Sequence, residues 1–188
     1  KVLIDLLMDF PKHDDFGGDI IPQAITTHNV FGFDFDGYWQ DIGTIRSFYE
    51  TNLALTTPET PFNFYDPKLP IYTDTRFLPG SIVEDSKLQD VLLAEGSRIR
   101  KAEISHAIIG IRSQISEGVV IRDSIIIGAD YYIPKRHPEV PIGIGRNCQI
   151  ESAILDKNVR IGSNAPNTST ASTPQIAART NGVVVVAW

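Results

Sequence analysis

The sequence has almost no cysteine, no long apolar run and no excess of positive charge. Its 188 residues include one cysteine, Cys148, which excludes an internal disulfide scaffold. No apolar run approaches the ~18 residues of a membrane-spanning helix, and no secretory signal pattern opens the sequence. The net charge of −6 argues against a protein that binds nucleic acid through its phosphates. We therefore expect neither a membrane nor a nucleic acid among its partners.

The composition is typical of a folded chain, with 42% hydrophobic and 21% charged residues. The sequence starts at Lys1 without a methionine, and Val2, Leu3, Leu6 and Leu7 follow at helical spacing. A helix that begins at once, without an initiator or a cap, leads us to expect a piece of a longer polypeptide.

The charge changes near residue 80: residues 1–80 carry a net charge of −7, whereas residues 81–164 are neutral. We expect mixed helix and strand over residues 1–56, with a half-buried strand at 30–35 and a helix at 43–55. Residues 57–80 contain five prolines and are predicted to be an extended linker.

A six-residue repeat dominates the remaining part of the chain. Isoleucines recur at 109, 115, 121 and 127, a second array runs through 144, 150, 155 and 161, and a weaker one precedes them. This period fits a parallel β-helix in which three hexads close one triangular coil and the isoleucines stack into a core. Ordinary sheet strands with a chance period are the alternative.

Two segments interrupt or end the repeat. Residues 130–141 break the period and are predicted to form a projecting loop, and residues 164–175 are rich in Ser, Thr, Asn and Pro, typical of a flexible segment. Residues 183–186 are four valines, predicted to form a last strand that caps the solenoid or pairs with another chain.

Residues 39–44 read WQDIGT and lie just before the helix expected at 43–55. In one interpretation Asp41 or Thr44 caps that helix and Trp39 belongs to a core. In the other, Asp41 presents its carboxylate to Mg²⁺ at the mouth of an α/β sheet. The residues alone leave both open.

The motifs DFGGDIIP at 15–22 and FDGYWQDIGTIRSFY at 35–49 resemble the glucose-1-phosphate adenylyltransferase (ADP-glucose pyrophosphorylase) family. The resemblance continues in collinear order to about residue 163, through PIYT, RFLP, IIGIRS, GADYY and VPIGIG. It implies the C-terminal end of a Rossmann-like nucleotidyltransferase domain over 1–56, a linker over 57–80 and a left-handed parallel β-helix over 81–188.

The resemblance implies an enzyme that makes ADP-glucose and pyrophosphate from ATP and glucose 1-phosphate, for glycogen or starch. Asp41 matches the second metal-binding aspartate of the family, in its W-x-D-x-G-T motif, and the expected cofactor is Mg²⁺. The family's glycine-rich nucleotide loop, first metal aspartate and sugar-phosphate lysine are not found in these residues. We therefore expect the 188-residue chain alone to be inactive and to contribute no catalytic residue.

The resemblance also implies regulation by an anionic sugar-phosphate or phosphoglycerate effector, within a homo- or hetero-tetramer. The residues that match basic or neighbouring positions of the family's effector site are Arg76, Arg146, Asp156 and Arg179. The stretch before Arg179 and the shortened loop at 133–139 depart from the family pattern. The implied location is a bacterial cytoplasm or a plastid.

Three alternatives stay open. One is a non-catalytic regulatory subunit of the same assembly. Another is a hexapeptide-repeat acyltransferase that binds acyl-coenzyme A at a trimer interface, in which His106 would be a candidate catalytic histidine, although a turn or surface histidine is the simpler interpretation. The third is a guanylyl- or thymidylyltransferase that carries a β-helix.

Overall fold

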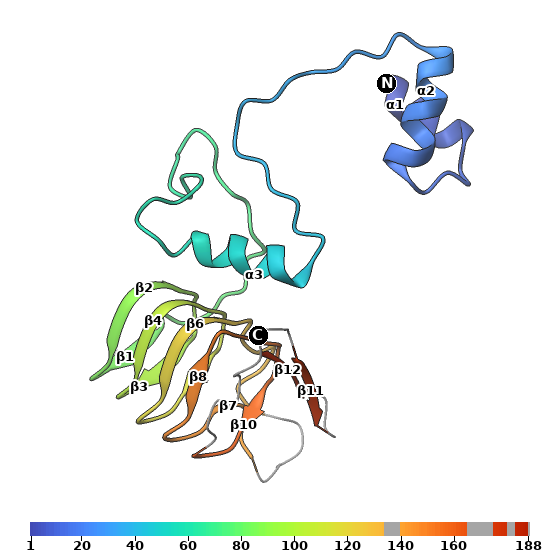
Figure 1. Cartoon of the computed structure of the whole chain (residues 1–188). Helices are drawn as coiled ribbons and strands as arrows, with labels where there is room; N and C mark the ends of the chain where they lie inside the picture. Colours follow the sequence, from blue (N-terminus) through green and yellow to red (C-terminus); the bar gives the residue numbers. More distant parts are fainter. Residues whose placement is uncertain (134–139, 165–174, 180–182, 188) are drawn as a thin grey trace. The chain divides into compact units, whose positions relative to one another are not determined.

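The structure is a computed structural model, and it describes residues 1–133, 140–164, 175–179 and 183–187 (Figure 1). Contacts divide the chain into two units, residues 1–37 and 38–188. This division falls before the boundary near residue 80 that the charge pattern suggests. None of the helices in the described part of the chain is both long and apolar enough to cross a membrane.

The first unit is a small group of helices: α1 (Val2–Asp9), the π-helix η1 (Phe16–Ile20) and α2 (Ile21–Thr27). The predicted opening helix is confirmed, and it buries Leu6. Asp15 precedes η1, and its side chain accepts a hydrogen bond of 2.5 Å from the N–H of Gly18. The other buried side chains of the unit are Ile20 and Ala24.

The strand predicted at residues 30–35 is wrong. These residues have no regular secondary structure, and Phe31 and Phe33 are 86% and 89% exposed. An alternating pattern is typical of a strand only when a neighbouring strand covers one face, and no described strand pairs with this segment.

The helix predicted at 43–55 is confirmed as α3 (Ile45–Ala54). Thr44 is its N-cap and forms a reciprocal capping box with Ser47, which satisfies main-chain N–H groups that a helix start leaves open. The helix buries Leu53 and packs against two strands of the solenoid described next. No helix or strand follows between α3 and residue 82, in agreement with the proline content.

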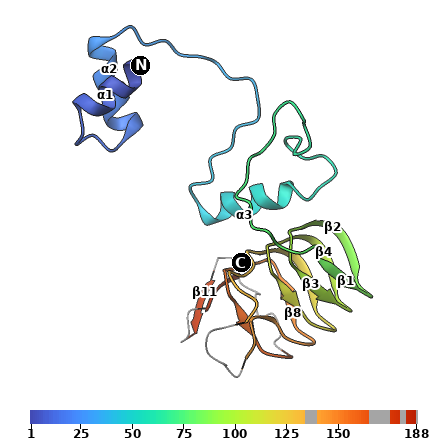
Figure 2. The same cartoon turned by 180° about the vertical axis from the view of Figure 1, so that it is seen from behind.

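The rest of the second unit is a β-solenoid with two sheets (Figures 1 and 2). The first sheet contains, in order, β1 (Ile82–Glu84), β3 (Arg98–Arg100), β5 (Gln114–Ile115), β7 (Gly143–Ile144) and β10 (Arg160–Ile161). The second contains β2 (Lys87–Leu93), β4 (Glu103–Ile109), β6 (Val120–Ile126), β8 (Gln149–Glu151), β9 (Ala153–Leu155), β12 (Val183–Ala187) and β11 (Gln175–Arg179). Successive coils pair in parallel.

Isoleucines from successive coils stack inside the solenoid, as predicted. Ile99 pairs with Ile115, which in turn pairs with Ile144, and all three are at most 2% exposed. The predicted coil of three full hexads is wrong, because the pairs Ile99–Ile115 and Ile104–Ile121 are offset by 16 and 17 residues. Ile127 is consequently only half-buried, and its neighbour Ile126 occupies the core position.

Left-handed backbone conformations shorten the coils at their corners. One corner recurs at Asp85, Lys101, Gly118, Asn147 and Asn164, and another at Asp90, His106, Asp123 and Ser152; all have φ between 44° and 74°. The register confirms the bend, since Gln89 pairs with Ser105 and Val91 with Ala107, leaving Asp90 and His106 outside the ladder. Asp, Asn and Gly tolerate this conformation best.

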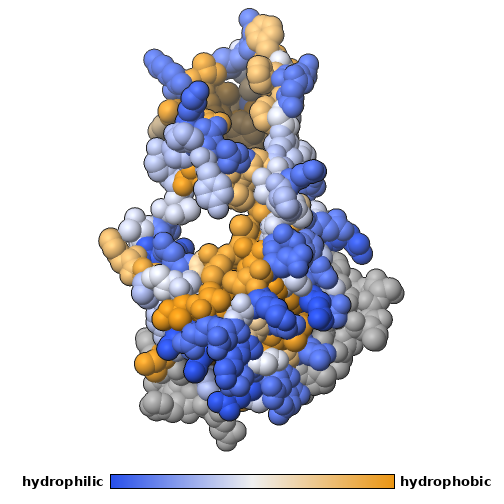
Figure 3. All heavy atoms as spheres, turned by 90° about the vertical axis from the view of Figure 1, so that its left-hand side faces the viewer, coloured by the Kyte–Doolittle hydropathy of each residue, from blue (hydrophilic) through white to orange (hydrophobic). Residues whose placement is uncertain are grey.

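The two ends of the solenoid differ. The strand predicted at 183–186 is confirmed as β12, and it caps the solenoid by antiparallel pairing with β9. At the opposite end β1 and β2 are edge strands, and Ile82, Val83 and Leu88 are 49%, 42% and 37% exposed there. Figure 3, which faces this end, shows apolar surface over it. Residues 134–139, which are half of the predicted loop at 130–141, and residues 165–174 of the segment at 164–175 lie outside the described residues.

Candidate functional site

The segment that holds Asp41 is fixed by the start of α3. The Thr44 hydroxyl accepts a hydrogen bond of 3.0 Å from the N–H of Ser47, and the Thr44 N–H donates to Ser47 Oγ at 3.2 Å. Asp41 is not the cap: its Oδ1 accepts a bond of 2.8 Å from the N–H of Gly43. The expectation that Trp39 belongs to a core is wrong, because this side chain is 76% exposed.

The geometry of Asp41 fits a metal ligand, although this residue supplies only one of the ligands that a metal ion needs. The side chain is exposed, and Oδ2 makes no hydrogen bond to any residue that the structure describes. A carboxylate oxygen held by a neighbouring N–H is the hard, oriented donor that Mg²⁺ prefers. No group of three or more His, Cys, Asp or Glu side chains among the described residues could hold a metal alone. Further ligands would therefore come from the substrate, from water or from other residues.

The residues expected to bind an effector lie in different parts of the second unit. Arg76 is exposed in the segment without regular structure before β1. Arg146 is exposed just after β7, where its N–H donates a bond of 3.2 Å to Ser163 Oγ. Asp156 is exposed just after β9, and its Oδ1 accepts a bond of 2.7 Å from the N–H of Lys157. No described contact joins these three side chains.

The main chain of Arg179 ends β11 and pairs with Val183. Its side chain, and with it the expected effector contact, lies outside what the structure describes.

A polar network beside Asp156 was missed in the sequence. Lys157 Nζ lies 3.2 Å from Asp130 Oδ1, and Asn158 Nδ2 donates to Asp130 Oδ2 at 2.9 Å. The Asp130 N–H donates in return to Asn158 Oδ1 at 2.9 Å. The hydrogen bonds from Asn158 and Lys157 hold the pKa of Asp130 below its usual value. The network joins the start of the loop at 130 to the corner at Asn158.

His106 is a corner residue. Its φ is 48°, it is half-buried, and its Nδ1 lies 2.6 Å from Asp123 Oδ1 in the next coil. Its neighbour in the corner, Asp123, also accepts a hydrogen bond from Tyr49 of α3 through its main-chain oxygen. The interpretation of His106 as a turn histidine is therefore confirmed, and its ring contacts the carboxylate of the corner residue of the next coil.

Three arginines line one surface pocket of the first sheet. The pocket has a volume of about 230 Å³ and is bounded by Arg98, Arg100, Gln114, Ile115, Ser116, Glu117 and Arg146. Among the expected effector residues whose side chains the structure describes, Arg146 is the one that lines it. The sequence signal for the others is the alternation Arg-Ile-Arg at 98–100, since a strand with a buried isoleucine presents both arginines outward.

Comparison with known proteins agrees with this architecture. Residues 76–187 match the family model of the GLGC left-handed parallel β-helix domain, and the chain belongs to this family. Residues 1–58 match the nucleotidyl transferase family model. The fold class is therefore a left-handed parallel β-helix that follows nucleotidyltransferase sequence.

A particular relative covers both parts. The chain is 42% identical, over 98% of its length, to the protein named glucose-1-phosphate adenylyltransferase small subunit, chloroplastic/amyloplastic, of Triticum aestivum. The expected resemblance to this enzyme family is confirmed. The chain spans 41% of the length of that relative.

Proposed function

We propose that the protein to which this chain belongs is a glucose-1-phosphate adenylyltransferase of starch or glycogen synthesis. One observation carries the proposal: a single collinear match, at 42% identity, runs through both the nucleotidyl transferase segment and the β-helix. A hexapeptide-repeat acyltransferase would share only the β-helix. Against a guanylyl- or thymidylyltransferase, the argument is the name of the wheat relative, which is an adenylyltransferase.

In this reaction a phosphate oxygen of glucose 1-phosphate attacks the α-phosphorus of ATP, and pyrophosphate leaves. The reaction needs alignment and charge neutralisation more than a protein nucleophile. Asp41 would hold Mg²⁺ through Oδ2, while the Gly43 N–H keeps Oδ1 in place. When bound, the metal supplies positive charge next to the phosphate oxygens. The role of α3 and Thr44 is to hold the Asp41 segment in one conformation.

We divide the chain into a catalytic-domain part over 1–56, a linker over 57–80 and a β-helix over 81–188. The β-helix carries regulation and assembly. Arg76, Arg146, Asp156 and Arg179 are the residues we assign to an anionic effector. The exposed edge strands β1 and β2, with their apolar side chains, support assembly with further subunits, as a homo- or hetero-tetramer. The name of the wheat relative supports a plastid location.

The experiment is an assay of ADP-glucose formation with two preparations. The complete protein, obtained by sequencing the transcript upstream of Lys1, is expected to form ADP-glucose and pyrophosphate with Mg²⁺, whereas the 188-residue chain is expected to form none. Turnover by the short chain, or a complete protein that is folded and inactive, would contradict the proposal. A complete protein that is folded and inactive, and in which the upstream catalytic residues are replaced, would instead favour a non-catalytic regulatory subunit.

A further inference from the structure

The pocket between the arginines of the first sheet lies on a rigid part of the solenoid. Arg98 and Arg100 flank Ile99, which is fully buried, so both arginine side chains leave β3 on the outer face. Their strand is held on both sides, by β1 and by β5. The positions of the two arginines are therefore fixed by the core and not by a loop.

The next coils complete the pocket. Gln114 of β5 lies in register with Arg98, and Ser116 follows the buried Ile115. These two uncharged side chains lie between the arginines of β3 and Arg146, which comes two residues after Ile144 of β7. One N–H of the Gln114 amide donates to the main-chain oxygen of Tyr132 at 3.3 Å, and the other is available to a ligand. The pocket thus has cationic walls and, between them, neutral groups that can donate hydrogen bonds.

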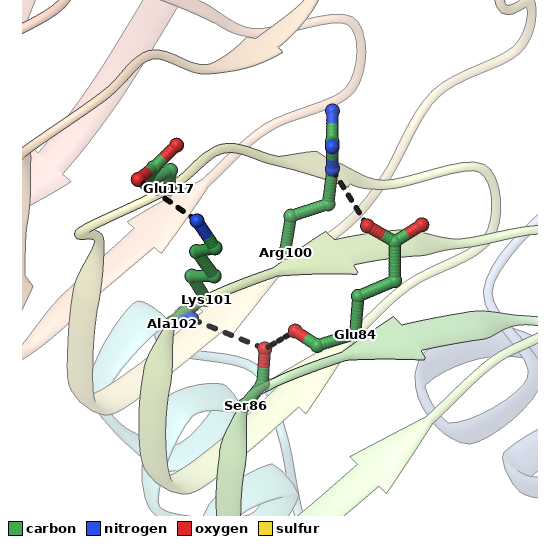
Figure 4. A network of polar contacts seen from close by, with 6 residues as sticks. All are labelled: Glu84, Ser86, Arg100, Lys101, Ala102 and Glu117. Atoms are coloured by element: carbon green, nitrogen blue, oxygen red, sulfur yellow. Dashed lines mark hydrogen bonds and ion pairs between the residues drawn. The ribbon is translucent and has the colours of Figure 1, made fainter.

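The positive charges of the pocket are only partly balanced. Arg100 Nε lies 2.7 Å from Glu84 Oε2, and Glu117 is paired with Lys101, whose Nζ lies 3.4 Å from Glu117 Oε1 (Figure 4). Arg98 and Arg146 have no ion pair with any residue that the structure describes. Each acid in the pocket or beside it already has a basic partner, so two positive charges remain in excess.

Uncompensated like charges on a fixed face repel one another, and a bound anion removes this repulsion. Guanidinium groups are the preferred partners of phosphate because their N–H groups bind two of its oxygens at once. Arg98 and Arg100 are about 7 Å apart along β3, and β7 lies about 10 Å away, two strand spacings across the sheet. This width fits a ligand with two anionic groups better than one phosphate ion.

We propose that the pocket of Arg98, Arg100 and Arg146 is a binding site for a small phosphorylated anion that carries two charged groups. Gln114 and Ser116 hydrogen-bond its central part. The site shares Arg146 with the residues assigned above to the effector, whereas Arg76 and Asp156 do not line the pocket. A regulatory role for this site rests on the proposed function, whereas the binding of the anion is independent of that function.

The test is calorimetric titration of the 188-residue chain with inorganic pyrophosphate and, separately, inorganic phosphate at low ionic strength. Pyrophosphate is expected to bind with one site and more tightly than phosphate. Arg98→Gln and Arg146→Gln are each expected to weaken pyrophosphate binding about tenfold, since each removes one charge-assisted contact. Arg122→Gln is the matched control, because Arg122 is an exposed arginine of β6 in the other sheet and is expected to leave the affinity unchanged.

No binding at millimolar pyrophosphate would overturn the proposal. Equal losses in Arg98→Gln and Arg122→Gln would also overturn it, because they would show general attraction to positive charge. Circular dichroism of each variant confirms the fold, and the exposed position of both arginines keeps the core intact. If the chain binds pyrophosphate while the complete protein makes no ADP-glucose, the site stands and the proposed function fails.

Discussion

The hydroxyl of Tyr49 donates a hydrogen bond of 2.6 Å to the main-chain oxygen of Asp123, joining α3 to a corner of the solenoid. The carboxylate of the same Asp123 lies 2.6 Å from His106 Nδ1 of the preceding coil. One corner residue thus holds the helix through its main chain and the neighbouring coil through its side chain. Because Thr44, the N-cap of α3, follows directly after the Asp41 segment, this contact also supports the conformation of that segment.

Tyr49→Phe tests the contact of α3. The variant loses the partly buried hydrogen bond to the Asp123 main chain and the side-chain hydrogen bond with Ser152. Its free energy of unfolding should therefore fall by about 1–2 kcal/mol at pH 7. Urea unfolding measures the change. Because Phe keeps the ring, an unchanged free energy would mean that the hydroxyl does not hold α3 on the solenoid.

The same variant also tests how the stability of the protein depends on alkaline pH. Burial raises the pKa of the Tyr49 phenol above its ordinary value of 10.0. The folded state therefore binds the phenolic proton more tightly than the unfolded state, and this stabilisation is present below pH 10 and is lost as the pH rises through the folded pKa. The difference in stability between wild type and Tyr49→Phe should shrink above pH 10. A difference that stays constant up to pH 11 would contradict the assignment.

Asp130→Asn tests the network beside Asp156. Hydrogen bonds from Asn158 and Lys157 lower the pKa of Asp130, so its contribution to stability is present above the unfolded value of 3.8 and is lost as the pH falls through the folded pKa. The variant should melt at a lower temperature than wild type at pH 7, and the two should converge toward pH 2. Glu59→Gln, an exposed substitution in the segment after α3, is the control and should follow wild type throughout.

Gly143→Ala tests how closely the coils approach. Gly143 has φ of 103°, and a Cβ there would overlap the main-chain oxygen of Gln114 in the preceding coil. Because both atoms belong to paired strands, neither can move away freely, and we expect a loss of about 3 kcal/mol. Gly162→Ala is the matched control, since a Cβ at Gly162 meets nothing within 4 Å. Equal stability of the two variants would show that the coils separate more easily than the structure indicates.

The sequence was sufficient to predict the solenoid, because one residue type marks the core at regular intervals. Ile99, Ile115 and Ile144 stack as expected, and the helix after Thr44 was evident from its cap and its apolar spacing. The length of each coil was not evident, because a strict six-residue period does not include the shortening at the corners. Asp, Asn and Gly occupy several of the left-handed corners, such as Asp85, Gly118 and Asn147, and these residue types were the signal that could have corrected it.

The site was harder to predict because it depends on contacts between coils. The sequence around Arg98 does not indicate that Arg146 lies nearby. The pairing of the strands brings both residues to the same pocket. The prediction of a strand at 30–35 was wrong for a related reason. An alternating pattern describes a single strand and does not show whether another strand pairs with it. The position of Asp41 before the helix made it a candidate for either a cap or a metal ligand, and the resemblance favoured the metal role.

The most direct test of the central claim is the rate of ADP-glucose formation by the complete protein and its Asp41→Asn variant at increasing Mg²⁺. The account predicts a loss of at least a hundredfold in kcat/KM, because the variant lacks the charge that holds the metal, with an unchanged fold by circular dichroism. Asp36→Asn, an exposed acid five residues earlier, is the control and should keep its activity. A variant of Asp41 with wild-type activity and wild-type Mg²⁺ dependence would contradict the account.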